Sequence, residues 1–150
     1  MNFTIEKTRT NKGTSLLDFP DSYIIIDIET TGLDPIYDEI IEITALKVNQ
    51  DKIVDTFTTL IKPTKPINPF ITELTGITND MVENSPTITD VLPDFLTFIK
   101  NETLIGHNIN FDINFLYDNF IKTGHEKGLT NNFVDTLRLG RKTLKNLKHH

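Results

Sequence analysis

Cysteine is absent from the 150-residue chain, and apolar runs long enough to span a bilayer are absent as well. The first absence excludes a disulfide framework, a thiolate metal site and a cysteine nucleophile. The second, together with a polar N-terminus that has no secretory signal, argues against a membrane partner and fits a cytoplasmic location. The length suits one domain, and a hydrophobic content of 37% is enough for a folded core.

An excess of basic residues is also lacking, because the formal net charge is −6. A protein that coats nucleic acid through charge alone is usually basic, so this class is disfavoured. An enzyme whose carboxylates hold metal ions is compatible, since the ions supply local positive charge. Residues 136–150 are different: they contain no acid, and their bases are Arg138, Arg141, Lys142, Lys145 and Lys148. This stretch fits contact with phosphates and fits a solvated helix surface equally well.

Apolar periodicity predicts one α/β domain preceded by an N-terminal arm. Residues 1–20 show no clear period and are expected to form a loose arm, which leaves residues 21–150 for the domain. Strands are predicted at 23–29, 39–49, 52–62, 103–107 and 133–135, with a hairpin turn at 49–51. Helices are predicted at 70–75, 79–83, 86–100, from 109 onward, and in the basic stretch after 135. This order predicts a mixed sheet with helices on its faces.

The most informative segment is Asp27-Ile28-Glu29-Thr30-Thr31-Gly32, which follows the apolar run Tyr23-Ile24-Ile25-Ile26. That run is typical of a buried strand, on which residues two apart point to the same face. Asp27 and Glu29 therefore present two carboxylates side by side. The carboxylates repel each other, and a divalent cation between them offsets the cost. A strand that turns polar as it reaches solvent explains the same residues equally well.

A second acidic motif is Gly106-His107-Asn108-Ile109-Asn110-Phe111-Asp112. A strand ends near His107, and Asn108 is predicted to cap a helix that starts at about Ile109. Asp112 then lies in the first turn, where the helix dipole alone favours an acid. Asp112 also shares a helix face with the apolar residue Phe115, and so it lies near buried structure and needs a partner. A metal ion shared with Asp27 and Glu29 would be such a partner.

Together, these motifs resemble those of the DEDD-type 3′–5′ exonucleases, above all the epsilon-type proofreading exonucleases of bacterial DNA polymerase III. The resemblance rests on Asp27-x-Glu29-Thr30-Thr31-Gly32 and on His107-Asn108-x-x-Phe111-Asp112, in this order and at this separation. Residues 73–78 (ELTGIT) and 134–136 (VDT) are also similar, so the resemblance extends over about residues 22–150. It implies a ribonuclease H-like fold, in which a mixed sheet of five strands lies between helices.

The resemblance further implies a two-metal hydrolysis of phosphodiester bonds at the 3′ end of single-stranded DNA, with RNA not excluded and a DNA polymerase as a candidate partner. Asp27 would bridge two Mg²⁺ or Mn²⁺ ions, Glu29 would bind the water-activating ion, and Asp112 would bind the other. Oxygen ligands suit these hard cations. The implied substrate-binding residues are Thr30, Thr31, Gly32, Leu33, Thr75, His107, Asn108 and Phe111. His107 equally fits a strand-end histidine with a purely structural role.

The family's third motif is a catalytic histidine followed five residues later by a fourth metal-binding aspartate, beyond the strand at 133–135 and one further helix. The chain stops at His149-His150. We therefore expect a C-terminally truncated exonuclease with three of the four carboxylates and no general base. A general base contributes typically ~10²–10⁴-fold to the rate, so low activity is expected of this chain.

Two other functions fit parts of the pattern. Aspartyl-nucleophile phosphatases also place Asp-x-acid at the end of a buried strand, but their second acid is an aspartate rather than Glu29. Those enzymes also continue into a helical crossover, whereas a hairpin is predicted here. The other reading is a catalytically inactive module that binds nucleic-acid ends or a protein partner. The sequence downstream of His150 discriminates between the two, because a His-x-x-x-x-Asp motif there would indicate a nuclease.

Overall fold

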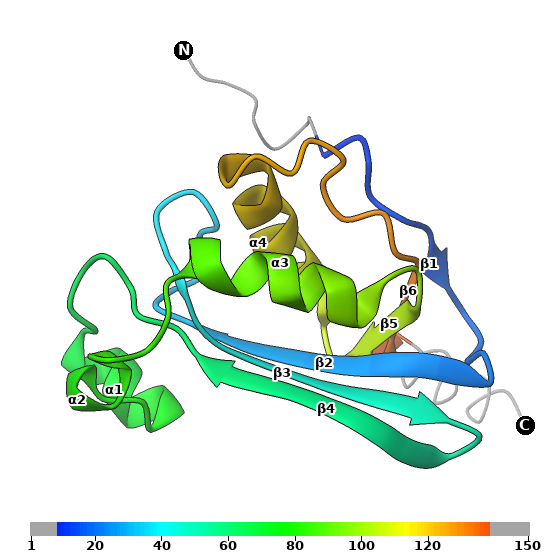
Figure 1. Ribbon diagram of the computed structural model, residues 1–150, viewed down its shortest axis with the longest axis horizontal. Coiled ribbons are helices and arrows are strands. Elements are labelled where there is room, and N and C mark those ends of the chain that lie inside the picture. Colours follow the sequence, from blue (N-terminus) through cyan, green and yellow to red (C-terminus); the bar gives the residue numbers. More distant parts are fainter. Residues whose placement is uncertain (1–8, 139–150) are drawn as a thin grey trace, which may run out of the picture.

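A six-stranded mixed sheet organises the molecule (Figure 1). The structure is a computed structural model and describes residues 9–138. In spatial order the strands are β1 (Ser15–Leu16), β6 (Phe133–Asp135), β5 (Thr103–Gly106), β2 (Ser22–Thr30), β3 (Ile40–Asn49) and β4 (Lys52–Leu60). Strands β2, β3 and β4 are antiparallel, whereas β5 runs parallel to β2 and to β6. The predicted α/β class, mixed sheet and hairpin turn before Lys52 are confirmed.

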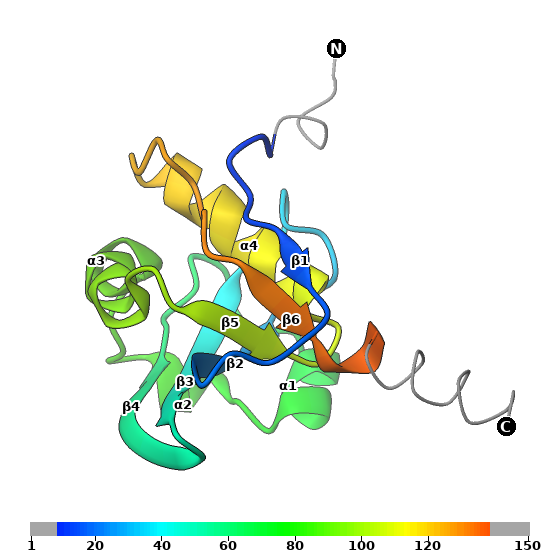
Figure 2. The same ribbon diagram turned by 90° about the vertical axis from the view of Figure 1, so that its right-hand side faces the viewer.

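Helices α3 (Ile88–Ile99) and α4 (Ile109–Lys122) lie side by side on one face of the sheet (Figures 1 and 2). The main core fills the space between this face and the two helices. Strand β2 shows why the chain folds this way: Ile24, Ile26 and Ile28 point into the core. Strict alternation then sends Ile25, Asp27 and Glu29 to the opposite face. The same pattern that builds the core therefore presents the acids.

A bulge in β3 redirects the end of the sheet that carries these acids. Glu29 pairs with Glu42 but Thr30 pairs with Ile40, so Ile41 is the extra residue. Ile40 belongs to the main core, while Ile41 belongs to a second apolar cluster. That cluster is completed by helix α1 (Pro69–Thr75), the loop after it and helix α2 (Asn79–Val82). The two short helices thereby adjoin the end of the sheet where β2 stops.

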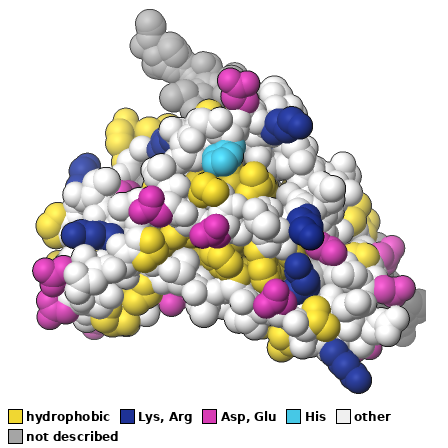
Figure 3. Space-filling view, viewed as in Figure 1, with side chains coloured by type: hydrophobic (Ala, Val, Ile, Leu, Met, Phe, Trp, Pro, Cys, Tyr) yellow, Lys and Arg dark blue, Asp and Glu magenta, His cyan; other side chains and the backbone are white. Residues whose placement is uncertain are grey.

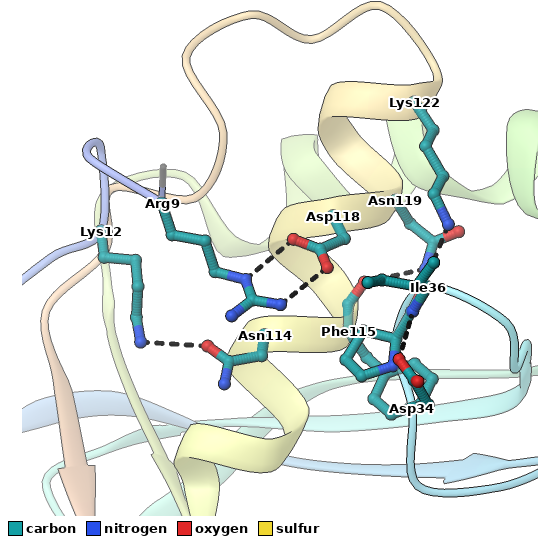
Figure 4. A network of polar contacts seen from close by, with 10 residues as sticks. Arg9, Lys12, Asp34, Ile36, Asn114, Phe115, Asp118, Asn119 and Lys122 are labelled. Carbon is teal, nitrogen blue, oxygen red and sulfur yellow. Dashed lines mark hydrogen bonds and ion pairs between the residues drawn. The ribbon is translucent and has the colours of Figure 1, made fainter. Parts of the chain in front are cut away.

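The N-terminal arm is docked on the domain, so the expectation of a loose arm is wrong for its described part. Ser15 and Leu16 of β1 pair in parallel with β6 and extend the sheet beyond the five strands expected. The backbone N–H of Thr14 donates to Asn132 Oδ1 at 2.9 Å, across a separation of 118 residues. Closer to the N-terminus, Arg9 forms an ion pair with Asp118 of α4 (Figure 4). A strand of two residues with so distant a partner leaves no periodic signal in the sequence.

The end of the described chain agrees with the predicted basic helix, because residues 136–138 are helical. The basic residues Arg141, Lys142, Lys145 and Lys148, as well as His149 and His150, lie outside the described residues. Between residues 9 and 138, no helix has the length and apolar character that a membrane crossing requires.

Candidate active site

Asp27 and Glu29 lie near the C-terminal end of β2, on the face away from α3 and α4. Their cross-strand partners on β3 are Thr44 for Asp27 and Glu42 for Glu29. Burial raises the pKa of Glu29, and the charges of Asp27 and Glu42 raise it further. Glu42 is a third acid of this face that sequence reasoning missed. Its position depends on the register between β2 and β3, which the bulge at Ile41 shifts by one residue.

Asp112 lies in the first turn of α4 and is only 6% exposed. Its carboxylate accepts a hydrogen bond from the backbone N–H of Ile28. The parallel ladder between β2 and β5 has its last pair at Ile25 and Ile105, so Asp112 bonds a part of β2 that β5 no longer covers. Burial raises the pKa of Asp112 to about 8, with a further contribution from the charge of Asp27 and a smaller one from Glu29. The structure thus places Asp112 within electrostatic reach of both predicted partners.

The donor chemistry of this site suits hard divalent cations, because all the groups are carboxylates. The raised pKa values of Asp112 and Glu29 show mutual repulsion and desolvation, which a cation would relieve. However, no three Asp, Glu or His side chains of the described residues already stand in a metal-coordinating arrangement. For these carboxylates to coordinate one ion together, at least one side chain would therefore have to rotate. Asp27 is exposed on β2 and has room to do so.

The loop after β2 is tied down by short polar contacts. Thr30 donates from Oγ1 to the carbonyl of Gly32 at 2.7 Å, and the N–H of Thr31 donates to the carbonyl of Glu39 at 2.9 Å. A Cβ at position 32 would overlap the Asp38 carboxylate, which explains the glycine. Leu33 projects from this anchored loop and is 84% exposed. A fixed loop with an exposed apolar tip has the form that a contact to a terminal base would need.

Near the same end of the sheet, helix α1 presents apolar side chains to solvent. Its N-cap, Asn68, accepts from the N–H of Phe70, and Gly76 ends the helix in the left-handed region. The hydroxyl of Thr75 is used locally, donating to the carbonyl of Ile71 at 2.8 Å. Leu74, its neighbour, is 71% exposed. Sequence reasoning did not single out Leu74, because a single leucine inside ELTGIT carries no periodic signal.

The turn between β5 and α4 differs from the prediction. Asn108 does not cap α4 with its side chain, because its backbone is left-handed, with φ of 55° and ψ of 46°. Its backbone N–H instead donates to Asp135 Oδ1 at 2.9 Å. His107 is exposed, and its Nδ1 lies 3.3 Å from Thr136 Oγ1. Phe111 is half-buried and packs on Phe115 with a ring-centroid distance of 4.9 Å.

Charged side chains elsewhere do not form a basic track on the face shown in Figure 3. On that face, the Lys and Arg side chains of the described residues are dispersed among acidic ones. This matches the net charge of −6. The face shown therefore presents no broad positive surface formed by the described residues.

Comparison with known proteins decides the family. A model of the family described as exonuclease (RNase_T) matches residues 24–150, which include all three site acids. The chain belongs to the exonuclease family. It is 48% identical over 141 residues to DNA polymerase III PolC-type of Caldanaerobacter subterraneus subsp. tengcongensis, covering 92% of this chain and 10% of that protein. It is 40% identical over 130 residues to DNA polymerase III PolC-type of Bacillus subtilis, covering 87% of this chain and 9% of that protein.

Solved exonucleases share the fold. Exonuclease X in complex with 5′ overhanging duplex DNA superposes with a TM-score of 0.64 and 30% identity, over 81% of this chain and 63% of that one. E. coli exonuclease I in complex with a dA16 oligonucleotide superposes with a TM-score of 0.69 and 17% identity, over 81% of this chain and 29% of that one. The chain is thus an exonuclease domain of ribonuclease H-like fold, and it spans about a tenth of the length of the PolC-type relatives.

Proposed function

We propose that this domain removes nucleotides from the 3′ end of single-stranded DNA in a reaction that depends on two divalent ions. The observation that carries the proposal is the buried Asp112 carboxylate, held at the N–H of Ile28 beside the charges of Asp27 and Glu29. Membership of the exonuclease family supports hydrolysis, and the DNA bound by exonuclease X and exonuclease I supports the substrate class.

In this proposal the three acids hold Mg²⁺ or Mn²⁺ through carboxylate oxygens. Ions bound there would supply Lewis acidity and lower the pKa of an attacking water. Asp112 is the least exposed of these ligands, because its side chain is buried and lies beside the backbone N–H of Ile28. Asp27 and Glu29 are the adjustable ligands on the open face. The backbone of residues 30–33 and the exposed side chain of Leu33 would hold the terminal nucleotide, with Thr75, His107, Asn108 and Phe111 around it.

The PolC-type relatives support a place beside a DNA polymerase in the cytoplasm, where the domain would remove misincorporated 3′ nucleotides. An aspartyl-nucleophile phosphatase is disfavoured by the fold. Strand β2 leads into the antiparallel neighbour β3 rather than into a helical crossover. The inactive end-binding module is the second candidate and becomes an outcome of the test.

The test uses the full natural polypeptide in which these 150 residues occur. A single-stranded DNA labelled at its 5′ end is incubated with Mg²⁺, and a ladder of products shortened from the 3′ end is expected. Asp27→Ala should abolish the ladder, whereas Asp94→Asn, on the exposed side of α3, should leave it intact. Binding without hydrolysis would support the inactive module, and faster digestion of a matched RNA would reassign the substrate. Release of the labelled 5′-terminal nucleotide before any ladder forms would contradict the proposed direction.

A further inference from the structure

Asp135, at the end of β6, has a buried carboxylate that the proposed chemistry does not use. It is 9% exposed, and its Oδ1 accepts two backbone hydrogen bonds. One comes from the N–H of Asn108 at 2.9 Å, and the other comes from the N–H of Leu137 at 3.0 Å. The two donors belong to different parts of the chain: the turn that starts α4 and the helical residues after β6. A single oxygen atom therefore joins these two segments.

The turn that Asp135 holds is conformationally demanding. Asn108 adopts a φ of 55°, which is uncommon for a residue other than glycine, and no side-chain cap bond accompanies it. The next residue, Ile109, is the first of α4, and the carbonyl of Asn108 accepts from the N–H of Phe111 at 3.1 Å. The backbone at Asn108 thus sets the direction in which the first turn of α4 leaves the sheet. Asp112 belongs to that turn.

Further contacts at the same junction support a positioning role. Gly106 and Asp135 are paired residues at the ends of β5 and β6. Thr136 donates from Oγ1 to the carbonyl of Gly106 at 3.4 Å and lies 3.3 Å from His107 Nδ1. Both hydrogen bonds that the Asp135 carboxylate accepts come from backbone N–H groups, so its link to the site runs through backbone geometry.

We propose that Asp135 is a positioning residue, which holds the left-handed turn at Asn108 so that Asp112 meets the acids of β2. The inference rests on the proposed function for its consequence, since the site positioned is the proposed cation site. It requires the hydrogen-bond acceptor at position 135 and does not require the negative charge. Asp135→Asn keeps an acceptor oxygen, whereas Asp135→Ala removes it.

Asn131 offers a matched control at the other end of β6. It is also buried and polar, and its Nδ2 donates to the carbonyls of Lys100 and Glu102, at 3.0 and 2.8 Å. Asn131→Ala therefore also leaves two backbone groups without their side-chain partner, but it does so away from the turn at Asn108. An effect of Asp135→Ala that came only from weaker folding should appear in both variants.

The experiment measures Mn²⁺ affinity by calorimetry and amide exchange at Asn108 and Leu137 by NMR, in the full natural polypeptide or in this chain once its spectrum shows a folded state. Asp135→Ala should weaken Mn²⁺ binding about 10-fold and expose both amides to exchange. Asp135→Asn should stay within about twofold of the wild type, and Asn131→Ala should leave the affinity unchanged. With a 3′-end digestion assay, Asp135→Ala should lower kcat more than it changes KM.

Three results would overturn the inference: wild-type Mn²⁺ affinity in Asp135→Ala, an equal loss in Asn131→Ala, or a 10-fold loss in Asp135→Asn. The Asp135→Asn measurement can contradict the inference even where the alanine variant does not fold. A wild-type protein that binds Mn²⁺ but digests no DNA would instead contradict the proposed function, and the affinity comparison would still test Asp135.

Discussion

Two buried acids on α4, Asp112 and Asp118, show how differently one helix can treat a carboxylate. Asp118 is 8% exposed and receives two hydrogen bonds from the Arg9 guanidinium, at 2.8 and 2.7 Å (Figure 4). Asp112 is 6% exposed and has a backbone amide, but its charged neighbours are also acids. The first carboxylate is compensated within the protein, and the second is not. A buried carboxyl whose pKa is raised because no cation compensates it is typical of a functional site.

The largest expected difference between the two acids concerns activity. Asp112→Asn should reduce 3′-end hydrolysis by more than about 100-fold, because it removes an anionic oxygen from the proposed cation site. Asp118→Asn makes the same change on the same helix and should retain the wild-type rate per folded molecule. Single-turnover digestion of a 5′-labelled oligonucleotide, normalised to folded protein, measures both rates. Equal losses would show that position on the helix, rather than the cation site, explains the effect of Asp112.

For the free energy of unfolding, the larger loss should come from disturbing Asp118 rather than from substituting Asp112. Arg9→Met leaves Asp118 buried without its cation and should lower the free energy of unfolding by about 3 kcal/mol. At pH 8.5, where the Asp112 carboxyl is largely ionised, Asp112→Asn should leave the metal-free protein at least as stable as the wild type, because it removes repulsion with Asp27 and Glu29. Urea unfolding in the presence of a chelator gives both values. A loss below about 1 kcal/mol for Arg9→Met would mean that the pair behaves like an exposed one.

A pH dependence of stability should follow from Asp112 and be absent from its asparagine variant. The pKa of Asp112 is about 8 in the folded protein and about 3.9 in an unfolded chain, so the folded state binds the proton more tightly. This contribution is fully present below pH ~4 and is lost as the pH rises through about 8, at up to about 1.4 kcal/mol per pH unit.

Urea unfolding of the metal-free protein between pH 5 and pH 8.5 tests this dependence. Stability should fall as the pH rises, and Asp112→Asn should flatten the curve, leaving the weaker contribution of Glu29, whose pKa is also raised. Added Mn²⁺ should restore stability at pH 8, because it favours the ionised carboxylates. A wild-type curve as flat as that of the variant would contradict the raised pKa of Asp112.

Local periodicity was enough to predict where Asp112 and its acidic neighbours lie, but not the contact between Asp118 and Arg9. The period of two in β2 predicted the shared face of Asp27 and Glu29, and the helix start after residue 108 predicted the position of Asp112 in a first turn. The contacts that were missed join distant parts of the chain. Arg9 and Asp118 are separated by 109 residues, and Asn108 and Asp135 by 27.

A shifted register explains a second group of missed features. The bulge at Ile41 places Glu42 opposite Glu29 and sends Ile41 to the second cluster, and a hydrophobic pattern alone does not locate a one-residue bulge. The predicted cap at Asn108 failed for a related reason. Asparagine favours N-caps but also tolerates the left-handed region, and the acceptor on Asp135 selects the second conformation.

The smallest expected effects concern the exposed apolar residues beside the acids. Leu33 and Leu74 are 84% and 71% exposed, so burial against a nucleotide would remove apolar surface from water only in the complex. Leu33→Ser and Leu74→Ser should each raise KM by no more than about 10-fold with little change in kcat, since a stacking contact contributes about 1 kcal/mol.

Ile53→Ser is the control, because Ile53 is 62% exposed near the opposite end of the β3–β4 hairpin. A similar rise in KM for Ile53→Ser would show that any exposed apolar residue has this effect. A fall in kcat without a change in KM would instead place Leu33 or Leu74 in contact with the reacting phosphate rather than with the base.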